Sequence, residues 1–254
     1  MKDFYIESNN TRIHCRLDLP HECQHCPMII IFHGLTGHME EEHLSALAEA
    51  ATESGYAALR ADLYGHGESG GMFADHTISI WLKQVLAVTD YAKSLPFVTG
   101  LYIAGHSQGG LTAALAAGMR PADYRALILL SPALNICEDA RRGIFLHDFR
   151  FVPGQFPESF AFSGHELNGS YLADAAKIHA EDALRQYTGP ILFVHGDQDE
   201  IVPLSVSQKA AALYRNSKLV ILPGDDHDYH MHADRMTEAV RQFLTETERR
   251  GEDC

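Results

Sequence analysis

A serine lies in a glycine-flanked pentapeptide of a kind that can expose a nucleophile. Residues 105–109 read G-H-S-Q-G, which matches the pattern G-x-S-x-G. An apolar run, 101–104, comes directly before it, and an Ala-rich segment with helical character, 108–119, follows. Such a strand-to-helix turn holds its serine in a strained conformation with Oγ exposed, and the two glycines avoid collisions there. We therefore predict that Ser107 is a catalytic nucleophile.

A serine hydroxyl needs a general base, and the base needs an acid to orient it. On a sheet with this kind of turn, the acid and the histidine follow later strands, in that order along the chain. Asp199 follows the apolar run Ile191 to Val194, and His227 is the first histidine after Lys218 to Leu222. Asp197 stands directly after a glycine and is interpreted as a residue that braces its own turn. Asp199 and His227 are therefore the predicted acid and base.

The sequence has only weak patterns for a metal site or a redox site. His230 and His232 stand near the start of the last helix, and residues two apart do not share a helix face. Cys23 and Cys26 form a C-x-x-C that lacks the further ligands of a zinc site. The five cysteines are an odd number, which suits a reducing compartment better than a disulfide framework. We expect no cofactor, no metal and a cytoplasmic location.

Two backbone N–H groups are candidates to stabilise a developing oxyanion. One belongs to Leu35, in the glycine-containing segment 33–37 that follows a strand ending at Phe32. The other belongs to Gln108, directly after the nucleophile. A further glycine-rich turn, 62–69, is expected to brace loops and not to take part in chemistry.

Strands alternate with helices along most of the chain. A hairpin is predicted first, with Asn9-Asn10 as its turn, and continuous apolar runs then indicate strands buried on both faces. The alternation predicts an α/β fold with a mainly parallel sheet and helices on both faces. Strands are predicted at 4–8, 12–19, 28–32, 56–61, 101–104, 126–130, 191–194 and 218–222, and helices at 40–54, 77–94, 108–119, 203–214 and 231–248.

The alternation stops between the sixth strand and about residue 188. This stretch contains six of the twelve phenylalanines. A structureless loop of that length is improbable in one domain, so we predict a core made of 1–131 and 188–254 and an inserted lid, 132–187. The lid is expected to line an aromatic concavity; the alternative is a satellite core that covers a sheet edge.

Composition limits the partners. The chain has 254 residues, 46% of them apolar, and a formal net charge of −14. That charge disfavours nucleic acid and anionic membranes, which bind clustered Lys and Arg. The N-terminus lacks the apolar region of a secretory signal, and the apolar runs fall short of the ~20 residues of a membrane span. A small-molecule ester is the expected partner, and a homodimer is left open.

Over nearly its whole length the chain resembles the α/β-hydrolases, and more narrowly it is similar to the bacterial cinnamoyl and feruloyl esterases. The similarity lies in the G-H-S-Q-G-G segment, the H-G-x-x-D-x-x-V-P segment from His195 to Pro203, a G-x-D-H segment and an insertion of this size. It implies that the insertion forms a wall of an aromatic pocket and contacts a phenolic ring. Asp139 and Tyr171 stand where such contacts are expected; their alternatives are a helix-start Asp and a core Tyr.

The expected activity is hydrolysis of feruloyl-type esters through an acyl-enzyme. A general acyl esterase, a monoacylglycerol lipase-like enzyme or a thioester hydrolase would use the same three residues, and composition does not separate them. A non-catalytic ligand-binding protein of the same fold is the alternative from another class.

Overall fold

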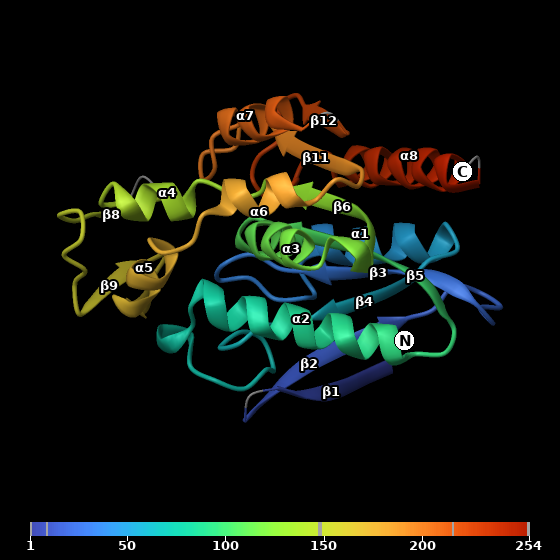
Figure 1. The fold of residues 1–254 in the computed structure, drawn as a ribbon, viewed down its shortest axis with the longest axis horizontal. Helices are drawn as coiled ribbons and strands as arrows, with labels where there is room; N and C mark the ends of the chain where they lie inside the picture. Colours follow the sequence, from blue (N-terminus) through green and yellow to red (C-terminus); the bar gives the residue numbers. More distant parts are fainter. Residues whose placement is uncertain (1, 9, 147–148, 215, 253–254) are drawn as a thin grey trace.

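The computed structural model describes residues 2–8, 10–146, 149–214 and 216–252 (Figure 1). An eight-stranded sheet runs through it in the order β1-β2-β4-β3-β5-β6-β11-β12. β1 and β2 pair antiparallel, as do β2 and β4, and the remaining neighbours are parallel. The predicted mainly parallel α/β fold is therefore confirmed. The strands are β1 (Lys2–Ser8), β2 (Thr11–Asp18), β3 (Cys26–Phe32), β4 (Ala57–Ala61), β5 (Val98–His106), β6 (Tyr124–Leu130), β11 (Ile191–Gly196) and β12 (Ser217–Leu222).

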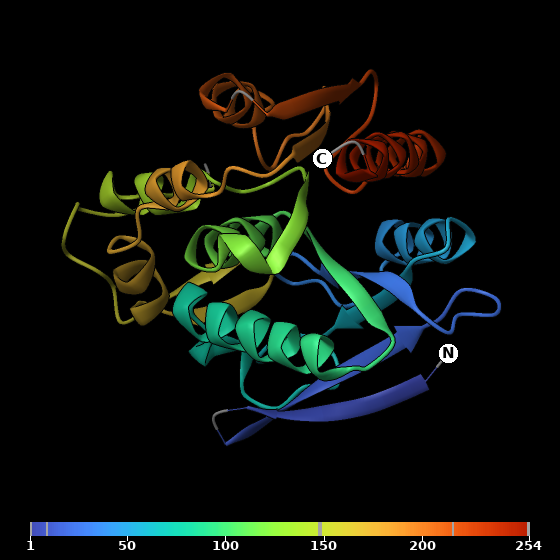
Figure 2. The same cartoon turned by 45° about the vertical axis from the view of Figure 1, so that its right-hand side comes forward.

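Helices cover both faces of this sheet, as the two views in Figures 1 and 2 show. α2 (Ile78–Ser94) and α3 (Gln108–Met119) lie on one face, and α1 (Glu42–Glu53) and α8 (Ala233–Glu252) lie on the other. α7 (Ser205–Leu213) connects β11 to β12. The predicted hairpin is present; Asn10 has φ 62°, and Asn9 lies outside the described residues.

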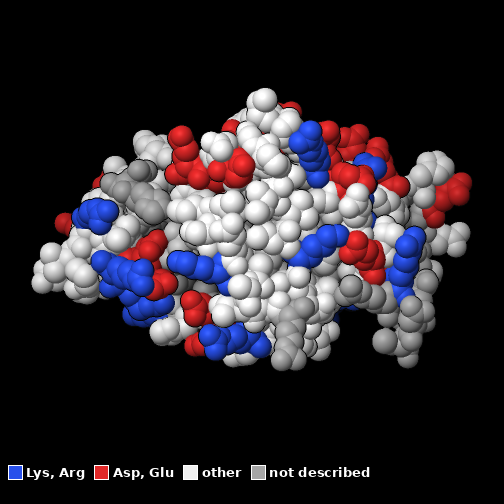
Figure 3. Space-filling view, turned by 90° about the horizontal axis from the view of Figure 1, so that it is seen from above, with Lys and Arg blue, Asp and Glu red and all other residues white. Residues whose placement is uncertain are grey.

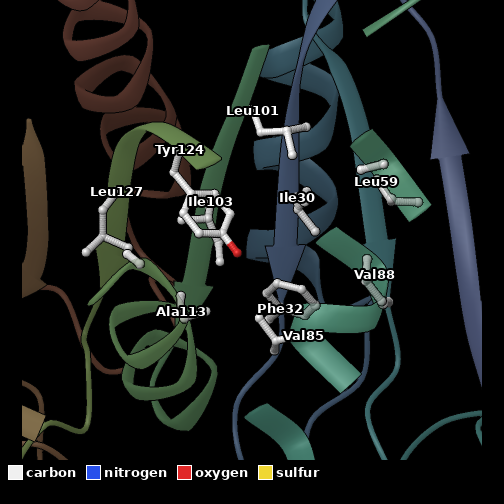
Figure 4. Packing of buried hydrophobic residues seen from close by; sticks show 14 of the residues in the cluster. Ile30, Phe32, Leu59, Val85, Val88, Leu101, Ile103, Ala113, Tyr124 and Leu127 are labelled. Atoms are coloured by element: carbon white, nitrogen blue, oxygen red, sulfur yellow. The ribbon is translucent and has the colours of Figure 1, made fainter. Parts of the chain in front are cut away.

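The strand sequences explain the two layers of helices. Along β3, Met28, Ile30 and Phe32 pack toward α2 and α3, whereas Ile29 and Ile31 pack toward α1 and α8. Successive side chains of a strand point to opposite faces, so a continuous apolar run supplies both cores. Figure 4 shows the first of these cores, in which side chains of the central strands meet those of the helices.

The parallel strands bring distant parts of the sequence to one edge. β3, β5, β11 and β12 all run in the same direction, so the loops that follow them lie together at their carboxyl ends. In open α/β sheets this edge is the usual place for a ligand. The predicted serine, acid, histidine and oxyanion-binding segments all follow these strands.

The segment 132–187 has secondary structure of its own, at the left of Figure 1. Its phenylalanines pack mainly against one another and against Leu111 and Leu115 of α3. Of the six phenylalanines in this segment, only Phe162 is among the residues that line the pocket described below. Its elements are α4 (Ile136–Arg141), β7 (Ile144–Phe145), β8 (Phe149–Arg150), β9 (Ser159–Phe162), β10 (His165–Asn168), α5 (Ser170–Ala175) and α6 (Ala180–Gln186).

One pair of cysteines is oxidised, whereas no disulfide framework was expected from the sequence. Cys23 and Cys26 form a disulfide, because the turn between β2 and β3 places their Cα atoms 6.0 Å apart, within bridging range. Cys15 and Cys137 are buried free thiols. Among the described residues, no helix combines the length and the apolar character that crossing a bilayer requires.

Candidate active site

Ser107 occupies a strained turn between β5 and α3. Its φ is 52° and its ψ is −119°, a conformation that costs free energy for a residue with a Cβ atom. Three backbone hydrogen bonds hold it there: its N–H donates to Leu130 O at 2.9 Å, and its carbonyl accepts from Leu111 N and Ala133 N. The end of β6 and the start of α3 therefore fix the serine at the carboxyl edge of the sheet.

The glycines beside Ser107 permit close backbone packing. A Cβ on Gly105 would lie 2.2 Å from the carbonyl oxygen of Gly109, and a Cβ on Gly109 would lie 2.3 Å from that of His33. Both distances are shorter than any real carbon–oxygen contact. Glycine is thus required at both positions so that β5, α3 and the loop after β3 can meet.

Asp199 and His227 form a pair that can activate a hydroxyl group. His227 Nδ1 lies 2.7 Å from Asp199 Oδ2, and the Asp199 side chain is fully buried. The other carboxylate oxygen accepts the N–H groups of Ile201 and Val202 at 2.9 and 2.8 Å. Because an ionised carboxylate only accepts, Nδ1 carries the proton and Nε2 of His227 is left as the basic atom.

A second histidine supports the carboxylate and was missed by the sequence analysis. His195 is fully buried, and its Nε2 lies 3.1 Å from Asp199 Oδ2 and 2.9 Å from Val202 O. Burial of Asp199 opposes its ionisation, but the hydrogen bonds from His195 and His227 outweigh this and hold the pKa of Asp199 well below its usual range. In the sequence, the signal for this contact was that His195 is the first residue and Asp199 the last residue of the H-G-x-x-D segment.

The other acid and histidines that follow the same strands do not join the Asp199–His227 pair. Asp197 is exposed and accepts the N–H of Gly224 at 2.7 Å. Gly224 belongs to the loop after β12, so Asp197 links two neighbouring loops and does not brace its own turn as predicted. His230 pairs with Asp226 at the surface at 2.7 Å, and His232 is half-buried.

A pocket of about 200 Å³ joins these groups. Ser107 and His227 both line it, and Leu35 and Gly34 form part of its wall. The insertion contributes three residues to the opposite side. The full lining is Gly34, Leu35, Thr36, Glu41, His106, Ser107, Leu146, Phe162, Ser163, Ile201, His227 and Asp228.

The loop that contains Leu35 is held by a buried histidine. His33 Nε2 accepts the N–H of Leu63 at 2.8 Å, so the proton is on Nδ1, which donates to Gly34 O at 2.7 Å. Burial lowers the pKa of His33 to about 4 and keeps it neutral, as this pattern requires. Gln108 begins α3, and the first N–H groups of a helix lack intrahelical acceptors. The two predicted oxyanion donors thus stand on fixed elements beside Ser107.

Asp139 and Tyr171 do not line this pocket. Tyr171 is fully buried, packs against Phe145 and His76, and donates its hydroxyl to Gln108 Oε1 at 2.7 Å. Asp139 is half-buried in α4 and accepts the side-chain amide of Asn135 at 2.7 Å. Both polar groups find partners inside the fold, which places Tyr171 beneath Gln108 and Asp139 beside its own helix start.

The glycine-rich turn 62–69 acts as a brace. Asp62 is buried, lies 3.0 Å from His14 Nδ1, and accepts the N–H groups of Met39 and Glu68. His66, in the same turn, accepts the N–H of Thr36 at 3.3 Å and so ties the turn to the pocket wall.

Several buried histidines beside the site are neutral. Burial lowers the pKa of His66 to about 2, and the neighbouring His33 and His76 lower it further. Burial also lowers the pKa of His76 to about 4. The rings of His33, His66 and His76 each lie about 5 Å from Trp81. This group supports the loops behind the pocket as uncharged aromatic surface.

Gly105→Ala is expected to destabilise the protein by about 4 kcal/mol or more, because the new methyl group meets backbone atoms that cannot rotate away. Chemical unfolding measures this loss. Gly70→Ala is the matched control: its Cβ would make an ordinary 3.4 Å contact with Arg12 N, and its cost should stay within about 1 kcal/mol. Equal stability of the two variants would contradict the tight packing around Ser107.

The unfolding free energy should fall as the pH decreases from 6.5 toward about 4, because His76 stays neutral when folded and takes up a proton when unfolded. Each such histidine contributes up to about 1.4 kcal/mol per pH unit. Unfolding curves of His76→Phe should therefore fall less steeply in this window. His21→Gln, which changes an exposed histidine, should keep the original slope, and an unchanged slope in His76→Phe would exclude the effect.

Comparison with known proteins agrees with this architecture. A family model described as serine aminopeptidase, S33 matches residues 24–168, and one described as TAP-like protein matches 172–254. A structure of Est1E from Butyrivibrio proteoclasticus with ferulic acid bound is 48% identical, with a TM-score of 0.94, over 96% of this chain and 98% of that chain. A second structure of Est1E is 46% identical, with a TM-score of 0.91 over the same shares of the two chains.

Curated relatives include the lysophosphatidylserine lipase ABHD12 of Xenopus tropicalis, which is 27% identical over 238 residues. That match covers 87% of this chain, and the chain spans only 58% of the relative's length. The family model, the sheet order and the strained serine turn agree with one another. The chain belongs to the α/β-hydrolase superfamily, in the family of the serine aminopeptidase S33 model.

Proposed function

We propose that the protein is a serine carboxylic ester hydrolase that cleaves small aromatic acyl esters of the hydroxycinnamoyl (feruloyl) type. The observation that carries this proposal is the buried Asp199–His227 pair, 2.7 Å apart, whose histidine lines one pocket with the strained Ser107. A nucleophile, a base and an orienting acid are the parts that acyl transfer needs.

In the proposed reaction, Nε2 of His227 takes the proton of Ser107 as Oγ attacks the ester carbonyl. The imidazolium is stabilised by Asp199, whose low pKa keeps it ionised, and His227 then protonates the leaving alcohol. Water, deprotonated by the same imidazole, attacks the acyl-enzyme. The carboxylic acid leaves and Ser107 regains its proton.

The developing oxyanion is assigned to the N–H groups of Leu35 and Gln108. Donors fixed before the reaction need no reorganisation when the charge appears. His33 fixes the first through Gly34, and α3 fixes the second. Tyr171 acts in this proposal through Gln108, whose side chain accepts its hydroxyl, and not by contact with substrate.

The aromatic acyl group is inferred from the pocket and from the similarity to Est1E, whose structure holds ferulic acid. Leu35, Leu146, Phe162 and Ile201 give the pocket apolar walls. Its volume of about 200 Å³ is small beside the ~300–1,000 Å³ of pockets for drug-sized ligands, which favours a compact acid over a long acyl chain. Asp139 as a contact for the phenolic group stays a prediction.

A lysophospholipid or another long-chain acyl ester is the second candidate, and the relatives named ABHD12 favour it. The carboxylate of Asp228 in the pocket wall opposes it for an anionic headgroup, because like charges repel. A neutral acyl ester or a thioester uses the same three residues and fits the same apolar wall.

Ser107→Ala should lower kcat on a soluble ester by a factor on the order of 10⁶, because the three residues act as a unit. Initial rates with p-nitrophenyl acetate, measured against a buffer blank, test this. Asp199→Asn should lower kcat by a factor on the order of 10⁴, since the imidazole loses its orienting carboxylate. Full turnover by Ser107→Ala would refute the mechanism. If the unaltered protein hydrolysed no ester, a ligand-binding role would be favoured.

Methyl ferulate should be hydrolysed with a kcat/KM at least tenfold above that of methyl octanoate, with Ser107→Ala as the blank. The reason is the small apolar pocket with Phe162 in its wall. Phe162→Ala should reduce the rate on ferulate more than the rate on methyl acetate, which is too small to reach the insertion. A preference for octanoate would keep the catalytic residues and discard the aromatic assignment.

A further inference from the structure

Three polar side chains meet at the wall of the pocket, and each has one buried polar atom without a partner in the described part of the chain. Oε2 of Glu41, Nε2 of His43 and Nδ1 of His106 are all buried, and none of the three atoms has a hydrogen-bond partner among the described residues. One donor atom from each side chain lies within 4.8 Å of the corresponding atoms of the other two. Buried polar atoms are almost always satisfied by protein, water or an ion, so these three atoms form a set that one shared ligand can satisfy.

The protonation of His106 directs a lone pair into this group. Its Nε2 lies 3.0 Å from the carbonyl oxygen of His227, which can only accept, so Nε2 carries the proton. Nδ1 is then an unprotonated donor atom. Metal-binding histidines usually show this arrangement, with the second ring nitrogen donating to a carbonyl or carboxylate.

The other two ligands come from the loop before α1 and from its first turn. His43 is buried and its ring lies 4.3 Å from that of His106, edge to face. The Glu41 carboxylate lies so close to Gly37 that a Cβ there would be 2.4 Å from Oε2. The Glu41 side chain is half-buried with Oε2 shielded from solvent, and a bound cation offsets the cost of keeping a charge on this oxygen.

We propose that Glu41, His43 and His106 form a binding site for a divalent transition-metal ion, with zinc as its representative. Two imidazoles and one carboxylate are a known ligand set for zinc with an open fourth position. Zinc–ligand bonds of ~2.0–2.2 Å require the three side chains to draw closer together around the ion. The site is distinct from Asp199 and His227, which the proposed hydrolysis uses.

An ion can reach this site from two sides. Glu41 and His106 line the pocket that contains Ser107, and Glu41 and His43 line a second cavity of about 170 Å³ beside Asp228 and His230. The two cavities therefore approach the site from two sides, although its three unsatisfied atoms are themselves buried. Asp228 stands in the wall of both cavities, and its negative charge favours the entry of a cation.

A bound ion would lie near the nucleophile. The position of a Cβ on Gly34 is 3.0 Å from Ser107 Cβ and 3.2 Å from His106 Nδ1, so the site forms part of the pocket wall. An ion there would occupy the side of the pocket that Ser107 and His227 line, since the rings of His106 and His227 have centroids 4.6 Å apart. Zinc should therefore inhibit the hydrolysis; this consequence rests on the proposed function, whereas binding does not.

The test is zinc stoichiometry. Untagged protein, stripped with a chelator, is dialysed against micromolar ZnCl₂, and bound metal is measured by mass spectrometry. We expect about one zinc per chain, and affinity lowered at least tenfold in Glu41→Gln and in His43→Leu. Cobalt in place of zinc should give the visible absorption of a low-symmetry tetrahedral site, which both variants lose. Circular dichroism shows whether each variant is folded.

The double variant His230→Ala/His232→Ala is the matched control, because it removes two nearby histidines outside the group, and it should bind zinc as the unaltered protein does. Loss of binding in that control, or full binding in folded Glu41→Gln and His43→Leu, would overturn the proposal. Absence of bound zinc from the unaltered protein would overturn it as well. Because the readout is bound metal, a protein that binds zinc but is inactive in its metal-free form would contradict only the proposed hydrolysis.

Discussion

The backbone of Ser107 is the constraint on which the rest of the site depends. A φ of 52° is unfavourable for serine, and it persists because the ends of β6 and α3 hold the residue by hydrogen bonds. That geometry needs glycine at 105 and 109, which lets the loop after β3 approach the start of α3. The oxyanion candidates are brought to the serine by the same close approach.

Buried histidines hold several of the loops around this turn by hydrogen bonds. His33 and His195 are buried and each bridges two elements, one at the oxyanion loop and one at the acid. The neutral His33 donates at one nitrogen and accepts at the other, so its ring sets the direction of both bonds. His106 repeats the pattern on one side and leaves the other nitrogen without a partner, which is the basis of the proposed metal site.

The insertion has two physical roles. Most of its aromatic side chains build a core against α3, and this core fixes the few residues that reach the pocket, Leu146, Phe162 and Ser163.

Charged side chains of both signs are found on the surface of the protein. On the face shown in Figure 3, basic and acidic side chains are interspersed around a broad uncharged area, although the chain carries a net charge of −14. Selectivity is expected from the walls of the pocket, to which the insertion contributes.

The sequence by itself determined the sheet, the helices on its two faces and the residues at the strand ends. Continuous apolar runs mark strands buried on both sides, and the glycines of the serine turn mark a conformation that few sequences adopt. Tertiary structure alone decided which polar groups meet. Packing joins separate segments when Tyr171 is buried under Gln108, and when Glu41 and His43 meet His106. Local sequence patterns carry no record of such contacts, because they depend on how separate elements pack in three dimensions.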